Sequence, residues 1–173
     1  MGGVAIAVCL GFAACDHGGI TADDVEGPFA WGGVENVTHL RHLWFSGQPD
    51  AAALEQAKTE GVKVVVNLRA ASESDWDERA AAEALGLTYY SVPVPGDQPF
   101  QREAFERVEA LVAQHRDGGV LIHCSSSNRV GAWLTAHLVE KHGLPADEAI
   151  SVGRRAGITK PAIETKVRAY LAD

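Results

Sequence analysis

The chain has 173 residues, of which 46% are hydrophobic and 22% are charged, and this composition suits one globular domain with a substantial core. Its formal net charge is -8 at pH 7. This charge argues against a nucleic-acid surface, because binding a phosphate backbone requires clustered Lys and Arg. An anionic ligand must therefore be held by a local site.

Residues 1–15, MGGVAIAVCLGFAAC, form a mostly apolar run that ends in small residues and Cys15. The run is short for a membrane span and is typical of a cleaved export signal. Its last residues, FAAC, resemble a bacterial lipoprotein processing site, where Cys15 would be lipidated and would tether the protein to a membrane. Against this, Phe12 stands where such sites usually carry Leu, and no Lys or Arg precedes the run. We predict an exported protein, periplasmic or anchored as a lipoprotein, and a cytoplasmic one if the leader does not function.

In chain order, residues 16–36 come next; they are rich in Gly and Asp and show no hydrophobic period. They are predicted to be a flexible tether that leads into a domain at 37–173. Within this domain, runs rich in Val and aromatic residues predict strands, and Ala- and Glu-rich or amphipathic runs that end at Gly predict helices.

The expected strands are 37–45, 62–68, 87–94 and 120–124. The expected helices are 51–60, which Asp50 caps, 75–85, 102–116, and one that runs from the polar loop at 125–128 to 142. Two more helices are expected after it, separated near Gly157, and the second of them is capped at Thr159. Alternation of strands and helices predicts an α/β fold. We expect three layers, with a central parallel sheet of about four strands flanked by helices.

Sites in such sheets lie beyond the carboxyl ends of the strands, so the residues that follow each strand are candidates. Arg69 follows the second strand, Asp97 the third, and the segment from Cys124 to Arg129 the fourth. These are an anion ligand, a carboxyl group and a thiol, and the topology predicts that they converge.

Cys124 is the strongest candidate for chemistry. If the leader is removed or Cys15 is acylated, Cys124 is the one remaining thiol of the mature chain and no internal disulfide can form. The alternative is that Cys124 is a small buried hydrophobic residue, since free cysteine is among the most buried residue types.

The segment HCSSSNRVG, 123–131, leads from the fourth strand into a helix. A loop of this kind points backbone N–H groups into one concavity at the positive end of the helix dipole, which favours a bound anion and the thiolate form of Cys124. Arg129 can reach back with a planar fork that matches two oxygens of an oxyanion. Short polar residues leave room in the concavity and are candidates for phosphate binding or for helix capping: Ser125, Ser126, Ser127 and Asn128. We read His123 as structural, and Arg129 taken alone would be a surface charge.

Three sequence runs carry a family resemblance: FSGQP, VVVNLR and HCSSSNRVGAWLTAHLVEKHGLPADEAISVGRRAGIT. Together they resemble a bacterial group of phosphatase-like domains known as beta-lactamase-hydrolase-like, within the protein tyrosine phosphatase superfamily. The resemblance covers roughly residues 37–159. Four residues separate Cys124 from Arg129, where cysteine-based phosphatases commonly have five, and members of this group share the shorter loop. The family commonly has Gly where Ser127 stands, and Ser adopts the backbone angles open to Gly only at a cost.

The resemblance implies a cysteine-phosphatase-like fold and a phosphatase mechanism. Cys124 would attack phosphorus to form a thiophosphoryl intermediate, while Arg129 and the loop amides would hold the equatorial oxygens. Asp97, in the loop PGDQP where related phosphatases place their acid, would protonate the leaving oxygen. Asp97 could equally be a turn residue.

Asp75 and Asp77 are the reserve candidates for the acid, although capping of the following helix explains them as well. Arg69 is either a second anion ligand or the partner of an acidic residue in SESD, 72–75. His39 and His42 lie three apart on a predicted strand and so point to opposite faces, which makes them a poor metal pair. We predict no metal and no cofactor.

Three functions remain open at this stage. The first is a cysteine-dependent phosphatase acting on a phosphoprotein, through phosphotyrosine, or on a phosphorylated small molecule. The second is a rhodanese-like sulfurtransferase that uses the same cysteine; its loops commonly have the shorter length, and sulfur transfer needs no general acid. The third is a non-catalytic domain that binds an anion or a phosphopeptide, which Ser127 in place of Gly keeps open.

Overall fold

The computed structural model describes residues 19–173; the predicted leader and residues 16–18 lie outside the described residues. Its six strands are β1 (Glu26–Trp31), β2 (Val34–Leu40), β3 (Leu43–Ser46), β4 (Val62–Asn67), β5 (Thr88–Ser91) and β6 (Gly119–His123). The helices are α1 (Ala51–Thr59), α2 (Glu78–Ala84), α3 (Arg102–Gln114), α4 (Asn128–His142), α5 (Ala146–Arg155) and α6 (Pro161–Ala172), with short 3-10 turns η1 (Ala22–Asp24) and η2 (Ala71–Glu73).

The strands form one sheet in the order β1-β2-β3-β6-β4-β5. From β3 to β5 all neighbours are parallel, and this four-stranded part is the sheet that the sequence predicts. The first two strands add an antiparallel extension at the β3 edge. The three-layer α/β prediction is therefore confirmed, with a sheet two strands wider than expected.

The predicted tether is wrong for the residues that the structure describes. The sequence EGPFAW, Glu26–Trp31, forms β1 and pairs with β2, and Trp31 is 4% exposed. Its ring centroid lies 4.6 Å from that of Trp44 in β3, so aromatic packing across the sheet holds a segment whose Gly-rich composition gives no periodic signal. The expected single strand at 37–45 is likewise split into β2 and β3 by a turn in which Arg41 has a φ of 60°.

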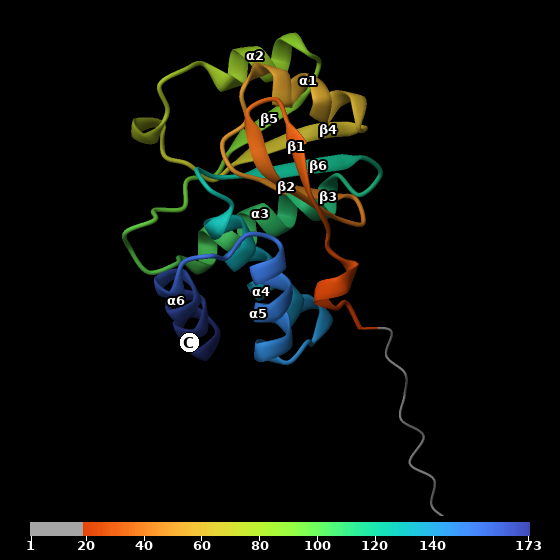
Figure 1. Ribbon diagram of the computed structural model, residues 1–173. Helices are drawn as coiled ribbons and strands as arrows, with labels where there is room; N and C mark the ends of the chain where they lie inside the picture. The colour runs from red at the N-terminus through yellow and green to blue at the C-terminus, as the bar shows by residue number, and fades with distance from the viewer. Residues whose placement is uncertain (1–18) are drawn as a thin grey trace, which may run out of the picture.

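Helices cover both faces of the sheet (Figure 1). On one face lie α1 and α2, each capped by an aspartate: Asp50 accepts a hydrogen bond from the N–H of Ala53 at 2.7 Å, and Asp77 accepts one from Ala80 at 3.0 Å. On the other face lie α3, α4, α5 and α6. None of the helices within residues 19–173 has the length and the apolar character that a membrane crossing would need.

The start of α6 differs from the prediction. We expected Thr159 to cap this helix, but Lys160 is the N-cap residue and makes no side-chain capping bond. Thr159 is engaged elsewhere: its N–H donates to Oδ1 of Asn128 at 2.9 Å, and its hydroxyl accepts from Nδ2 of Asn128 at 3.1 Å. The start of α6 is thus held to the start of α4.

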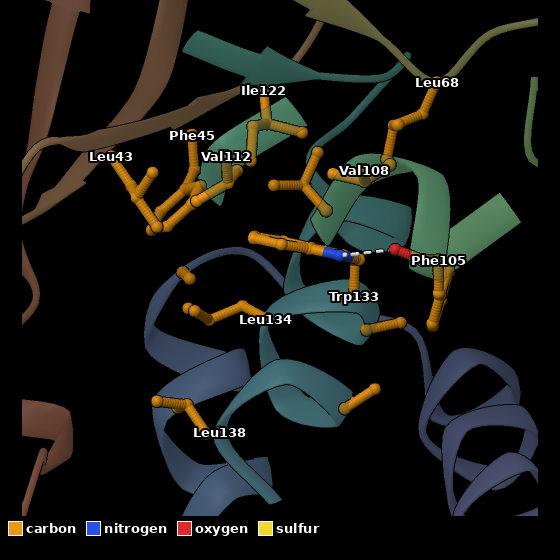
Figure 2. Close-up of a cluster of buried hydrophobic side chains, with 14 of the residues drawn as sticks. Leu43, Phe45, Leu68, Phe105, Val108, Val112, Ile122, Trp133, Leu134 and Leu138 are labelled. Carbon is orange, nitrogen blue, oxygen red and sulfur yellow. Dashed lines mark hydrogen bonds between the residues drawn. The ribbon is translucent and has the colours of Figure 1, made fainter. Parts of the chain in front are cut away.

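The larger core lies between the sheet and α4, the most deeply buried helix. Figure 2 shows Trp133 of α4 lying flat beneath the sheet, with Leu43, Phe45 and Ile122 above it. Trp133 is 1% exposed, and its indole N–H donates to the carbonyl oxygen of Phe105 in α3 at 3.3 Å. A helix packed this firmly holds the residues of its first turn in a defined position at the carboxyl edge of the sheet.

Candidate active site

The carboxyl ends of the parallel strands and the starts of α4 and α6 surround one pocket. Its volume is about 310 Å³, and it is lined by Glu73, Gly96, Cys124, Ser125, Ser126, Asn128, Arg129, Lys160, Ala162, Ile163 and Lys166. The structure therefore brings together most of the predicted site residues, and it adds three charged side chains, Glu73, Lys160 and Lys166, that the sequence analysis did not single out.

Cys124 follows β6 directly and is fully buried at the base of this pocket, with 0% exposure. Its N–H donates to the carbonyl oxygen of Ser46 at 3.3 Å, which fixes the loop to the end of β3. Within residues 19–173, no backbone hydrogen bond is donated by the N–H groups of Ser125, Ser126, Asn128 or Arg129. These groups stand at the amino end of α4, where the helix dipole favours an anion.

Arg129 lies beside the thiol and is 5% exposed. One terminal nitrogen donates to the carbonyl oxygens of Val94 (2.9 Å) and Leu68 (3.3 Å), and the other donates to Oγ of Ser125 at 3.1 Å. Both terminal nitrogens also donate to the carboxylate of Glu73, at 2.9 and 2.6 Å. The fork predicted to hold an oxyanion is thus oriented by strand-end carbonyls and by a carboxylate.

Burial alone would lower the pKa of Arg129, but its hydrogen bonds to Glu73 and its interaction with the neighbouring Cys124 outweigh burial and raise it. The same bonds from Arg129 hold the pKa of Glu73 below its ordinary value despite partial burial. Glu73 is therefore an ionised positioning group, and an ionised carboxylate cannot donate a proton to a leaving group. The signal for this role in the sequence was the acidic cluster SESD, which we associated with Arg69.

Arg69 does not line the Cys124 pocket. Its Nε lies 3.8 Å from Oε2 of Glu73, and its guanidinium also donates to the side-chain oxygen of Gln48. Of the two roles predicted for Arg69, the structure shows the ion pair with the acidic cluster.

Ser127 has a φ of 63° and a ψ of -4°, in the left-handed region. It is the N-cap residue of α4 but makes no side-chain capping bond; its hydroxyl donates instead to the carbonyl oxygen of Ala156 at 2.9 Å. A Cβ at Gly157 would lie 2.5 Å from the Cβ of Ser127, so the serine needs the glycine opposite it. Ser127 therefore adopts a left-handed backbone, which costs a non-Gly residue free energy, and its buried hydrogen bond to Ala156 offsets part of that cost.

Asn128, Ser125 and Ser126 shape the loop. The side chain of Asn128 donates to the carbonyl oxygen of Ser126 at 3.2 Å and accepts from the N–H groups of Thr159 and Lys160 at 2.9 and 3.0 Å. Ser125 accepts from Arg129, and its carbonyl oxygen accepts from the N–H of Gln48 at 3.4 Å. The side chain of Asn128 therefore braces the loop against the start of α6.

A second carboxylate, Glu78 of α2, faces His123, the residue before Cys124. Nε2 of His123 lies 2.7 Å from its Oε1, although the ring is not aligned for a linear hydrogen bond, and the two side chains are 0% and 2% exposed. Oε2 of Glu78 accepts from the side-chain nitrogens of Gln48 (2.9 Å) and Asn67 (3.2 Å). The sequences FSGQP and VVVNLR thus supply Gln48 and Asn67, the two side chains that donate hydrogen bonds to Glu78.

The predicted acids lie outside the pocket lining. Asp97 is exposed in the loop between β5 and α3, directly after Gly96, which does line the pocket. Asp77 caps α2, and Asp75 borders a neighbouring open cleft. Of the three, Asp97 is thus the one next to a lining residue.

A larger cavity, of about 380 Å³, lies at the opposite edge of the sheet, near Arg41 and the C-terminal ends of α3 and α4. It includes His42 but none of the predicted site residues, and His39 stacks on Trp44 with ring centroids 4.0 Å apart. Within the described residues, no three His, Cys, Asp or Glu side chains gather as a metal site would require.

A strand–loop–helix cradle that sets a buried thiol beside a guanidinium is the arrangement of the cysteine-dependent phosphatases of the protein tyrosine phosphatase superfamily. Comparison with known families agrees, because residues 44–143 match the family described as polymorphic toxin system, DSP-PTPase phosphatase (Tc-R-P). The chain belongs to this family and is a hydrolase of the tyrosine phosphatase-like class. The superfamily resemblance seen in the sequence is confirmed, and neither the sulfurtransferase nor the non-catalytic alternative is favoured.

Solved structures with this fold include a DUF442 candidate phosphatase of Shewanella putrefaciens CN-32, which is 26% identical, with 81% of this chain and 88% of that one covered and a TM-score of 0.66. TpbA of P. aeruginosa is 23% identical over 79% of this chain and 83% of its own, with a TM-score of 0.65. Tk-PTP in its active form is also 23% identical, over 75% and 90%, with a TM-score of 0.65. No curated protein sequence matches the chain.

Proposed function

We propose that Cys124 is the nucleophile of this phosphatase, that Arg129 and the loop amides bind the transferred phosphoryl group, and that Asp97 is the general acid. The observation that carries this assignment is the burial of Cys124 at the base of a pocket into which the N-terminal N–H groups of α4 and the guanidinium of Arg129 converge. In the reaction, the sulfur attacks phosphorus as the bond to the leaving oxygen breaks, and water later releases phosphate from Cys124.

The acid is assigned by elimination within the pocket. Glu73 is the one carboxylate among the lining residues, and its pairing with Arg129 keeps it ionised. The proton must therefore come from a neighbouring loop. Asp97 follows Gly96, whose carbonyl oxygen accepts a hydrogen bond from Nζ of Lys166 at 2.7 Å, so the loop that carries Asp97 is tied to the pocket wall.

The substrate class that this site supports is a phosphorylated compound. TpbA has been solved in complex with phosphotyrosine, and SIW14 of S. cerevisiae, 14% identical to this chain, is described as a PP-IP phosphatase. Both a phosphoprotein and a phosphorylated small molecule are therefore within the proposal.

The test of the nucleophile is a paired assay, with p-nitrophenyl phosphate in one arm and thiosulfate plus cyanide in the other. Phosphate release that disappears in Cys124→Ser supports the proposal, whereas thiocyanate formation alone would contradict it.

Asp97→Asn tests the acid. General acid catalysis contributes about 100-fold or more, so the variant should lose roughly that factor with an alkyl phosphate and much less with p-nitrophenyl phosphate, whose leaving group needs little protonation. Asp117→Asn, in the exposed turn before β6, is the matched control. Equal losses with both substrates would remove Asp97 from the mechanism.

We also propose export, with residues 1–15 as the leader and Cys15 as a lipidation site. This proposal rests on the apolar run and the FAAC sequence alone. Fractionation of cells that express the full chain tests it: Cys15→Ala should move the protein from the membrane to the periplasmic fraction, and cytoplasmic protein in both cases would contradict it.

A further inference from the structure

The wall of the pocket opposite the cradle is made by α6, which lies beyond the residues that match the phosphatase family. Asn128 ties this helix in place by accepting hydrogen bonds from the N–H groups of Thr159 and Lys160. The amino ends of α4 and α6 therefore face the same pocket. Each contributes the positive end of a helix dipole.

Two lysines line this wall, Lys160 at the start of α6 and Lys166 one turn past Ala162 and Ile163. Within residues 19–173, neither takes part in an ion pair; the hydrogen bond from Lys166 goes to an uncharged carbonyl oxygen, that of Gly96. Two arginines near these lysines, in contrast, do form ion pairs. Arg154 and Arg168 both pair with Glu164, at 2.7 and 3.1 Å.

The charge of the pocket is therefore positive in a chain whose net charge is -8. Of its lining residues, Arg129, Lys160 and Lys166 are cationic, and Glu73 is the one carboxylate, already bonded to Arg129. A single phosphoryl group on the cradle occupies the guanidinium and the loop amides, and two lysine ammonium groups remain on the facing wall. They can balance a second anionic group of the same ligand.

The size and lining of the pocket favour a small molecule. A volume of about 310 Å³ lies at the lower end of the range for small-molecule sites. The uncharged side chains of the α6 wall are the aliphatic Ala162 and Ile163, and no aromatic side chain is among the lining residues to form a platform for a phenyl ring.

We propose that Lys160 and Lys166 form a second anion subsite beside the Cys124 cradle, and that the preferred substrates are small phosphoesters carrying a second phosphoryl group. The proposal rests on the phosphatase function proposed above and narrows its substrate class.

Binding to the Cys124→Ser protein tests the subsite without turnover. Calorimetric titration with inorganic phosphate and with pyrophosphate should show pyrophosphate binding about tenfold more tightly, which is the gain expected from two partly solvated charge pairs. In Lys160→Gln/Lys166→Gln the ratio should fall to about twofold or less. Gln at 166 retains a donor for the carbonyl oxygen of Gly96, so the loss would report charge.

Lys58→Gln is the matched control, because Lys58 is an exposed lysine in the last turn of α1, away from the pocket. It should leave the ratio unchanged. A similar fall in Lys58→Gln would mean that the overall field of the protein sets the preference. Such a result, or equal affinity for the two anions in the protein with both lysines, would overturn the proposal.

Turnover gives an independent measure in the protein with Cys124 intact. The ratio of kcat/KM for fructose 1,6-bisphosphate over fructose 6-phosphate should be about tenfold and should fall towards one in the double lysine variant. A lysine-dependent preference for an acidic phosphotyrosine peptide over both sugars would overturn the small-molecule assignment. The two proposals can fail separately. If the protein does not hydrolyse p-nitrophenyl phosphate but still binds pyrophosphate in a lysine-dependent manner, the catalytic proposal is contradicted and the anion subsite is supported.

Discussion

Glu73 and Glu78 contact the two ends of the segment from His123 to Arg129, and the two carboxylates differ in burial and in their partners. The front pair is Glu73 and Arg129: Glu73 is 32% exposed and bonds through both carboxylate oxygens to Arg129, which lines the pocket. The back pair is Glu78 and His123: Glu78 is 2% exposed, faces the fully buried His123 and accepts hydrogen bonds from Gln48 and Asn67. The front pair lines the pocket, and the back pair is buried inside the fold. With Arg129 as the proposed phosphoryl ligand, this contrast predicts that Glu73 affects catalysis by orienting Arg129, whereas Glu78 affects the stability of the fold around the loop.

The largest expected effect comes from breaking the back pair. Glu78→Ala leaves Gln48 and Asn67 without their buried acceptor and removes the carboxylate that faces His123. Loss of one partner of such a buried network costs about 3 kcal/mol or more. The free energy of unfolding in urea should fall by that amount. Glu83→Ala, on the same helix in an exposed pair with Arg79 at 3.3 Å, should change it by less than about 0.5 kcal/mol. Similar small values for both variants would contradict a structural role for Glu78.

Breaking the front pair should separate activity from stability. Glu73→Gln keeps a hydrogen-bond acceptor for Arg129 but removes the charge, so the free energy of unfolding should change by about 1 kcal/mol or less. Because Arg129 would no longer be held by a bidentate pair, kcat should fall by roughly tenfold or more. Glu83→Gln serves as the control. An unchanged kcat would show that the strand-end carbonyls alone orient the guanidinium.

The front pair also predicts a dependence of stability on pH. The hydrogen bond from Arg129 lowers the pKa of Glu73 in the folded chain below its ordinary value of 4.5. A carboxylate of this kind stabilises the fold above its unfolded pKa, and its contribution is lost as the pH falls through the folded pKa. The difference in unfolding free energy between the parent protein and Glu73→Gln should therefore be constant above about pH 5.5 and shrink steadily below 4.5. A difference that grows on acidification would contradict this sign.

The smallest effects are expected at Ser127, in the loop that leads from His123 to Arg129. Ser127→Ala keeps the left-handed backbone and loses the hydrogen bond to Ala156, so it should destabilise the fold by about 1 kcal/mol. Ser127→Gly loses the same bond but relieves the backbone cost of about 1 kcal/mol, so its stability should be close to that of the parent. Urea denaturation of the two variants makes the comparison, and equal destabilisation would mean that the backbone at this position carries no cost.

The sequence was sufficient for the elements whose signals are local. The Val-rich run at 62–68 predicted β4, the apolar run at 120–124 predicted β6, and Asp50 predicted the start of α1. The helix expected at 75–85 is shorter, because Asp77 caps α2 and the helix begins at Glu78. The edge of the sheet at which the site lies followed from the rule for parallel strands.

The features that the prediction missed depend on contacts far apart in the sequence. The segment Glu26–Trp31 becomes a strand because Trp31 and Phe29 pack against Trp44, which no local pattern reveals. Glu73 reaches Arg129 across 56 residues, and Asn128 reaches Thr159 across 31. Charge alone identified the acidic cluster at 72–75, but only tertiary structure could show that its glutamate serves Arg129 as well as Arg69.

The central claim is that Cys124 carries the phosphoryl group. Its most direct test is acid quenching of the protein during turnover of p-nitrophenyl phosphate, followed by mass spectrometry of the peptide that contains Cys124, with Asp97→Asn included to slow hydrolysis of the intermediate. The account predicts a phosphoryl adduct on Cys124 that is more abundant in Asp97→Asn. Phosphate release without such an adduct, together with undiminished activity in Cys124→Ser, would contradict it.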